Sequence, residues 1–291
     1  MVTQLWISKL LYEQVSIPLL PLKDEEKERM QKQGYMSEHL LCFYSMTSDR
    51  TALYHGNFPV YFNGHGGADV ILFGLTDMEE DGLTCILHLL QGSVTELNIV
   101  SPRPLTGIAG IANLYADLDY HINLDLFDLE MRGNNYKDVR YSVHRANKMN
   151  YQTRISREFT RKHTYILSRH MANHQLDAWD YEELLSLERF FKEHNHGFMM
   201  EVYREEELVG FDVIDFFENN KIMVVPLGIY LDSASLADFL MYENIKYAKS
   251  RGCKWLDIGL ACRNPGIQDF KEKWFAEPKY QLFVQTISPS K

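Results

Sequence analysis

The chain has 291 residues, of which 45% are hydrophobic and 24% charged, and its formal net charge is -10. This length suffices for one large domain or two smaller ones, and the apolar content is too high for a disordered protein. The acidic balance argues against a general nucleic-acid binder. No apolar run reaches the roughly 18 residues of a membrane-spanning helix, so we expect no integral membrane segment.

Cysteine usage and the N-terminal residues bear on the cellular compartment. The four cysteines form no CxxC pair, which argues against a secreted disulfide framework and against a zinc knuckle. The first residues lack the positively charged start and the continuous apolar stretch of a signal peptide. We therefore expect a cytoplasmic protein.

The first part of the chain is rich in predicted strands. The charged segment 24–33 predicts a short exposed helix that ends at Gly34. After it, short β-branched or aromatic runs are separated by Gly, Asn, Asp or Pro, which is the pattern of strands and turns. The strands are expected at 40–46, 51–54, 60–63, 69–73, 83–89 and 95–100.

Near residue 136 the hydrophobic period changes from two residues to about 3.6, which indicates a helix. Tyr136, Val139, Val143 and Ala146 share one face of it, and Lys137, Arg140, His144 and Lys148 share another. A second helix is expected at 178–195. The remaining elements are strands at 198–203, 207–217 and 221–231, a helix at 234–251, a strand at 254–258, a helix at 265–274 capped by Asn264, and a strand at 280–286.

One strongly basic segment lies within this acidic chain. Residues 132–170 contain ten Lys and Arg residues and two acidic residues. Such a segment suits a phosphate-bearing partner, such as coenzyme A, the acceptor end of a tRNA or a phospholipid head group. A solvated helix face without a ligand is the alternative.

Two stretches resemble a known group of proteins. LDLFDLEMRGNNYKDVRYSVHRANK (124–148) is similar to a lysine-containing helix with repeated arginines in the C-terminal domain of phosphatidylglycerol lysyltransferases. ADFLMYENIKYAKSRGCKWLDIGLACRNPGIQDFKEKWFAEPKY (237–280) resembles the last helix-strand-helix-strand of that family. The FemABX aminoacyltransferases and other GNAT-like proteins share this second stretch. The resemblance covers mainly residues 120–291.

The resemblance implies an α+β, tandem GNAT-like (acyl-CoA N-acyltransferase) fold with two mixed β-sheets flanked by helices. We place the two halves at 1–130 and 131–291 and expect the active cleft in the second. The implied enzyme is an acyltransferase or aminoacyltransferase that modifies an amine or hydroxyl on a small molecule, a peptide or a lipid head group. Its donor would be aminoacyl-tRNA or acyl-CoA, and no tightly bound cofactor is expected.

The expected donor loop departs from the GNAT pattern. Acetyl-CoA users carry a glycine-rich loop after the fourth strand, where backbone N–H groups meet the pyrophosphate. Here residues 231–235 read LDSAS, without glycine and with one carboxylate that would repel a diphosphate. This favours an aminoacyl-tRNA or another carrier. Residues 106–110 (TGIAG) could serve as such a loop, with an ordinary turn as the alternative.

The resemblance places the site between residues 226–231 and 254–259. Asp257 could act as a base or hold the acceptor amine, and Tyr230 could donate a proton. A capping carboxylate and a packed strand tyrosine are the structural alternatives, and Cys262 is interpreted as structural. The residues expected to bind substrate or phosphate are Lys137, Arg140, Arg145, Lys148, Arg263 and Asn264.

Other residue patterns do not amount to a site. Asp212 and Asp215 do not share a face of their predicted strand, so we do not interpret them as a carboxylate pair. Two histidine pairs lack the Glu or Cys partner of a zinc motif, and no metal site is predicted. These pairs are His170 with His174 and His194 with His196.

Two further functions remain compatible with the sequence. A non-catalytic GNAT-like module could use the basic segment to bind a phosphorylated ligand or an RNA end. A membrane-peripheral protein that reaches a lipid acceptor from solution would follow from the lysyltransferase resemblance. A deep polar cleft between 226–231 and 254–259 would favour the enzyme, and a closed apolar junction would favour the binding module.

Overall fold

The structure is a computed structural model, and it describes a defined set of residues. These are residues 20–21, 23, 25, 26, 29, 42, 51–55, 58–62, 67–71, 96–105, 111–174, 187–193, 197–217, 221–231 and 234–287. The chain divides into one unit of residues 1–37, 49–118 and 280–291 and another of residues 38–48 and 119–279. The predicted helix at 24–33 and the predicted strands at 40–46 and 83–89 lie mostly or wholly outside the described residues.

The first unit contains a mixed sheet. In spatial order its strands are β1 (Leu20–Pro21), β2 (Thr51–His55), β3 (Phe58–Phe62), β4 (Gly67–Ile71), β5 (Glu96–Ser101) and the end of β12 (Ala276–Ile287). Strands β4 and β5 are parallel, and the other pairs are antiparallel. The Leu105 N–H donates to Oε1 of Gln285 at 2.6 Å, and its carbonyl accepts from Nε2 at 3.0 Å. This buried amide holds the segment after β5 against β12.

The second unit also contains a mixed sheet, flanked by helices. In spatial order its strands are β6 (Ile111–Asn123), β11 (Trp255–Leu260), β10 (Ile222–Tyr230), β9 (Glu207–Phe217), β8 (Phe198–Arg204) and β7 (Gln152–Ser156). The helices are α5 (Lys137–Asn147), α6 (Arg161–His174), α8 (Leu187–Glu193), α9 (Ala234–Ser250) and α10 (Pro265–Lys273). Strands β10 and β11 are parallel. None of the helices in the described part of the chain is both long and apolar enough to span a membrane.

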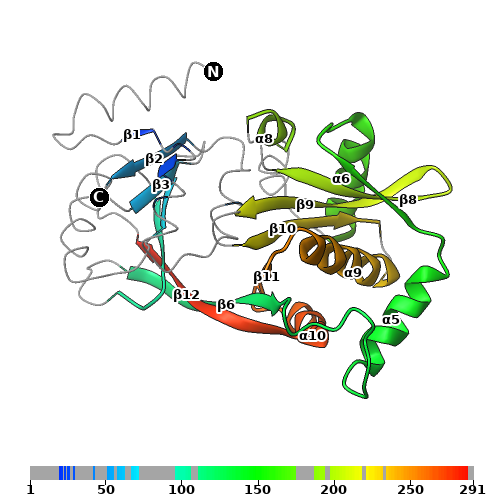
Figure 1. The fold of residues 1–291 in the computed structure, drawn as a ribbon. Coiled ribbons are helices and arrows are strands. Elements are labelled where there is room, and N and C mark those ends of the chain that lie inside the picture. The colour runs from blue at the N-terminus through cyan, green and yellow to red at the C-terminus, as the bar shows by residue number, and fades with distance from the viewer. Residues whose placement is uncertain are drawn as a thin grey trace. The chain divides into compact units, whose positions relative to one another are not determined.

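The two faces of β9 carry different chemistry. Phe211 and Val213 pack with Leu167 of α6 in the apolar core. Asp212, which lies between them, accepts a hydrogen bond from Asn244 of α9. Because successive strand side chains point to opposite faces, α6 covers one face of this sheet and α9 covers the other (Figure 1).

Strands β10 and β11 separate after a short parallel segment. Their register covers residues 222–224 of β10 and 255–257 of β11. The pairing of β10 with β9 is also irregular between Val224 and Leu227, and Pro226 lies in this stretch. A proline cannot donate to the hydrogen-bond ladder and within sheets occurs at edges and bulges. The sequence around Pro226 therefore accounts for the break at the point where the two strands diverge.

Most elements from β8 onward confirm the sequence predictions to within a few residues. Asn264 caps α10 as predicted, since its side-chain oxygen accepts from the N–H groups of Gly266 at 2.9 Å and Ile267 at 3.4 Å. The predicted helix at 178–195 is described only as α8. The sequence patterns do not predict β6, β7 or α6. In β6 the apolar alternation is hidden because Asp117, Asp119 and His121 occupy buried positions.

Two long strands, β6 and β12, contribute residues to both units. The division falls between residues 118 and 119, within β6, and between residues 279 and 280, within β12. These strands are 13 and 12 residues long, so each contributes to both units. Residues 280–291 belong to the first unit because the end of β12 pairs with β5.

We expect α6 to stabilise the second unit through its apolar face. Leu167 is fully buried in the core, whereas Arg169 on the same helix is exposed. Leu167→Ala should lower the free energy of unfolding by about 2–5 kcal/mol. The control Arg169→Ala should change it by less than about 0.5 kcal/mol. Urea unfolding followed by circular dichroism measures both, and equal losses would contradict this packing.

Candidate active site

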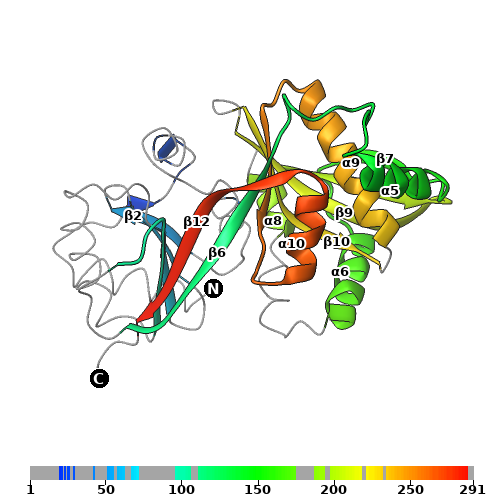
Figure 2. The ribbon, with the colours of Figure 1, turned by 90° about the horizontal axis from the view of Figure 1, so that it is seen from below.

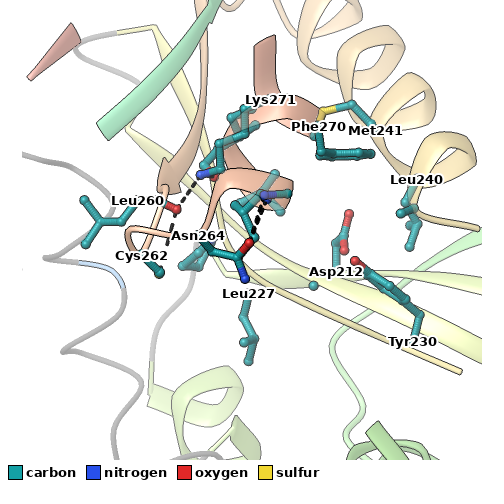
Figure 3. Close-up of a pocket in the computed structure, with 17 residues that line it drawn as sticks. Asp212, Leu227, Tyr230, Leu240, Met241, Leu260, Cys262, Asn264, Phe270 and Lys271 are labelled. Atoms are coloured by element: carbon teal, nitrogen blue, oxygen red, sulfur yellow. Dashed lines mark hydrogen bonds between the residues drawn. The ribbon is translucent and has the colours of Figure 1, made fainter. Parts of the chain in front are cut away.

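A cleft of about 820 Å³ lies where β10 and β11 diverge. It is lined by residues of β9, β10, β11, α9, α10 and the loop before α10, all within the second unit (Figure 3). Its volume falls within the roughly 300–1,000 Å³ typical of small-molecule sites. Most of the described lining is apolar, and the two residues in it with acidic or basic side chains are Asp212 and Lys271.

Asp212 of β9 forms a polar part of this cleft. The residue is only 5% exposed, and its Oδ2 accepts a hydrogen bond from Nδ2 of Asn244 at 2.5 Å. Burial raises the pKa of Asp212 to about 7, although the hydrogen bond from Asn244 acts in the opposite direction. The carboxyl can therefore exchange a proton near neutral pH, as a general acid or base must.

Gly228 of β10 allows Asp212 and Tyr230 to approach each other. Gly228 lies opposite Asp212 in the β9–β10 pair. A Cβ at Gly228 would lie 2.8 Å from Oδ1 of Asp212 and 3.4 Å from Cε1 of Tyr230. Both side chains line the same end of the cleft (Figure 3). The predicted proton donor Tyr230 thus lies beside a carboxyl that the sequence analysis did not select.

Lys271 of α10 fixes the end of β11. The residue is 5% exposed, and its ammonium donates to the backbone carbonyls of Ile258 and Gly259 at 2.5 Å and of Leu260 at 2.7 Å. These carbonyls lie beyond the residues of β11 that pair with β10. The three ammonium protons thus bind carbonyls in the stretch where the register of β11 with β10 has ended and its register with β6 is irregular.

The loop between β11 and α10 forms one side of the cleft. Cys262 and Arg263 have φ angles of 52° and 50°, in the left-handed region that is uncommon for residues other than glycine. Cys262 and Asn264 line the cleft. Arg263 is exposed and is not among the described lining residues. Of the two residues of this loop predicted to bind substrate, Asn264 therefore lies in the cleft.

Asp257, the predicted base, lies on the other face of β11. The adjacent Ile258 lines the cleft, and neighbouring strand side chains point to opposite faces. Asp257 is fully buried, and its Oδ1 accepts from the N–H of Gly259 at 2.8 Å. Its Oδ2 lies 3.5 Å from Nε2 of His121. This geometry does not favour contact between Asp257 and a ligand in the cleft.

Asp119, His121 and Asp257 form a buried cluster that the sequence analysis does not anticipate. Asp119 and His121 are two residues apart on β6, and His121 lies opposite Asp257 on β11. One ligand atom from each lies within 4.8 Å of the others. Among the described residues, this is the group with the spacing to hold a metal ion.

Four basic residues in α5 or directly after it are predicted to bind substrate or phosphate. The described lining of the cleft contains none of these four residues. Arg140 donates to two backbone carbonyls in the preceding segment 131–133. Arg145 forms an ion pair with Asp238 of α9 at 3.7 Å, and α5 packs beside α9 (Figure 2). Lys137 and Lys148 are exposed. The structure thus gives Arg140 and Arg145 partners within the fold and leaves the two lysines on the surface.

Several features considered in the sequence lie outside the described residues. These are residues 106–110, residues 232 and 233 of the expected donor loop, and His194 and His196. His170 is described, and its Nδ1 lies 3.0 Å from the backbone oxygen of Tyr230. The imidazole of His170 therefore contacts the end of β10.

Asp212 and Lys271 are not among the site residues predicted from the sequence. Asp212 carries a local signal, because it is an acidic residue within the apolar run GFDVI. From the sequence, Asp212 is considered only as a partner of Asp215. Asp215 lies on the opposite face of β9 and accepts from Sγ of Cys42 at 3.5 Å. Lys271 carries no local signal, since its role depends on tertiary contacts with β11.

Replacing Asp212 by Asn should change how stability depends on pH. An Asp with a raised pKa in the folded state contributes stability that is fully present below the unfolded value of 3.8 and is lost as pH rises through about 7. The full effect is on the order of 4 kcal/mol. Asp212→Asn lacks this titration, so its stability relative to the wild type should increase between about pH 4 and pH 7 and then level off. Urea unfolding at several pH values, with Asp215→Asn as control, measures it; a pH-independent difference would contradict the assignment.

Comparisons with known proteins identify the fold. No family model and no curated protein sequence matches the chain. The C-terminal domain of a putative lysylphosphatidylglycerol synthetase from Agrobacterium fabrum is similar in structure, with a TM-score of 0.65, 13% identity and 92% of each chain covered. A tandem GNAT protein from the clavulanic acid biosynthesis pathway has a TM-score of 0.60, 11% identity and coverage of 94% of this chain and 98% of that one. FemX has a TM-score of 0.57, 10% identity and coverage of 92% and 97%. The chain therefore has a GNAT-like α+β fold, as the sequence resemblance implies.

Proposed function

We propose that the chain is a transferase that moves an activated acyl or aminoacyl group to an amine or hydroxyl acceptor in the cleft between β10 and β11. The observation that carries this proposal is the Asp212 carboxyl, which lines the cleft with its pKa raised to about 7. The similar structures support the reaction class, since they include a putative lysylphosphatidylglycerol synthetase and a tandem GNAT protein.

Asp212 is assigned as the general base. Its carboxylate takes a proton from the acceptor, which becomes the nucleophile that attacks the carbonyl carbon of the donor. A C–N or C–O bond forms, and the bond from the carbonyl carbon to the leaving oxygen or sulfur breaks. Tyr230, which meets Asp212 at Gly228, would supply a proton to the leaving group.

The separation of β10 from β11 would leave backbone N–H groups available to stabilise negative charge in the transition state. Beyond residues 222–224 the register of β10 with β11 ends, and N–H groups on that edge of β10 would stabilise the oxyanion that develops on the donor carbonyl. Backbone carbonyl groups that point at the same oxyanion would destabilise it, because their oxygens carry partial negative charge. Lys271 draws three carbonyls of β11 toward its ammonium, which favours the reaction.

An aminoacyl-tRNA is the preferred donor, with an acyl thioester as the alternative. Residues 231–235 offer no glycine and one carboxylate where a pyrophosphate would have to bind. Lys137 and Lys148 are exposed within the basic segment 132–170 and would contact a polyanionic donor such as a tRNA acceptor end. The acceptor would be a small molecule, a peptide or a lipid head group.

The alternative function is a non-catalytic module that binds a phosphorylated ligand. That function predicts a closed junction between β10 and β11, whereas the strands border a cleft of about 820 Å³. The mostly apolar walls of the cleft match the apolar character expected of the binding module rather than the polar character expected of the enzyme. The buried carboxyl of Asp212 favours the transferase, because its negative charge would repel a phosphate group bound in the same cleft.

Mass spectrometry of reaction products tests the proposed function. The protein is incubated with acyl-CoAs or with total aminoacyl-tRNA, together with amine and hydroxyl acceptors, and the expected product is a new amide or ester. Asp212→Asn should slow transfer by about 10²–10⁴-fold. Asp215→Asn changes the same strand on the opposite face and should retain the rate. The proposal would be contradicted if neither donor class gave a product, or if Asp212→Asn kept full activity.

A further inference from the structure

The cleft offers a ligand one charged group. Asp212 and Lys271 are the charged residues of its described lining. The ammonium of Lys271 donates to three backbone carbonyls at the end of β11, so its charge is directed at the main chain. Oδ2 of Asp212 accepts from Asn244, while Oδ1 lies against Gly228, where no side chain intervenes. Asp212 therefore presents an acidic oxygen to the cleft.

The remaining walls of the cleft are formed largely by apolar side chains. They include Leu240 and Met241 of α9, Ile258 of β11, and Ile267 and Phe270 of α10. Several of these side chains surround the space in front of Asp212 (Figure 3). Burial of ligand surface against them is favourable only for apolar groups. The cleft thus combines one carboxyl with mostly apolar walls, and Tyr230 and Asn264 add neutral polar side chains.

We infer that the acceptor of this cleft is a primary amine with an apolar aliphatic or aromatic body. Its ammonium would form a charge-assisted hydrogen bond with Oδ1 of Asp212, and its body would pack against Leu240, Met241 and Phe270. This inference rests on the proposed function, in which the amine is the nucleophile. It goes further by selecting the amine over the hydroxyl and by naming the kind of molecule that carries it.

The same walls disfavour two other classes of acceptor. A dibasic amine would bring a second ammonium against apolar side chains, where it loses hydration without gaining a partner. An alcohol of the same shape would lose the charge-assisted hydrogen bond to Asp212. We therefore expect the cleft to select monoamines over diamines and over alcohols.

The proton balance of the transfer fits an ammonium acceptor. One proton of the ammonium passes to the Asp212 carboxylate, and the free amine attacks the donor carbonyl. The second proton reaches the leaving oxygen or sulfur through Tyr230, which gives its own proton and takes one from the nitrogen. The products are an amide and the protonated carrier, and Asp212 then releases its proton to solvent.

Binding of a matched set of probes tests the inference with no donor present. Octylamine, 1,8-diaminooctane and 1-octanol share one chain length and differ only in their end groups. Isothermal titration calorimetry at about pH 8 should show octylamine binding about tenfold more tightly than the other two. Asp212→Asn should weaken octylamine binding about tenfold and leave 1-octanol binding unchanged, which also reports that the cleft is intact. Asp215→Asn should leave all three affinities unchanged.

The outcomes separate this inference from the proposed function. Equal or tighter binding of 1,8-diaminooctane or 1-octanol, no binding of octylamine, or octylamine binding that survives Asp212→Asn would overturn the inference. Transfer of an acyl group to another acceptor would then still support the proposed function. Selective octylamine binding together with no transfer product from either donor class would contradict the proposed function and leave the binding inference standing.

Discussion

The separation of β10 from β11 is the constraint on which the candidate site depends. The two strands pair through residues 222–224 and 255–257, and then Pro226 interrupts one strand while Gly259, with φ of 76°, bends the other. A parallel pair that ends inside a sheet leaves backbone groups without ladder partners. Lys271 supplies partners to the carbonyls of β11, so the strands can stay apart and the cleft can remain open.

Asp212 supplies an ionisable carboxyl to the cleft between the two strands. The carboxyl is buried between Asn244 and Gly228, and burial raises its pKa to about 7. A buried ionisable group destabilises the fold wherever it is charged. An apolar residue at this position would pack with Leu240 and Met241 without that penalty. The sequence of β9 therefore places a buried acidic residue within the apolar run GFDVI, which is the behaviour expected of a functional position.

Local sequence signals predict the second unit better than its site. Periodicity, the Asn264 cap and Pro265 place α9, β11 and α10 correctly because these signals act within a few residues. The strand β6 is not predicted, because polar residues occupy its buried positions and hide the apolar alternation that identifies a strand. The predicted site includes Tyr230 and Asn264, which line the cleft, and Asp257, which does not. Which face of β11 meets the cleft is set by the packing of α9 and α10, and the alternation of residues along a strand does not reveal it.

The titration of the Asp212 carboxyl tests the central claim most directly. Carbon-13 NMR of the side-chain carboxyl carbons, with Asp212→Asn used to assign the resonance, gives its pKa in the intact chain. We expect a midpoint of about 7 and a displacement of this midpoint toward lower pH when octylamine binds, because a bound ammonium stabilises the carboxylate. A midpoint at the ordinary Asp value of about 4 would contradict a buried, proton-exchanging carboxyl in the cleft.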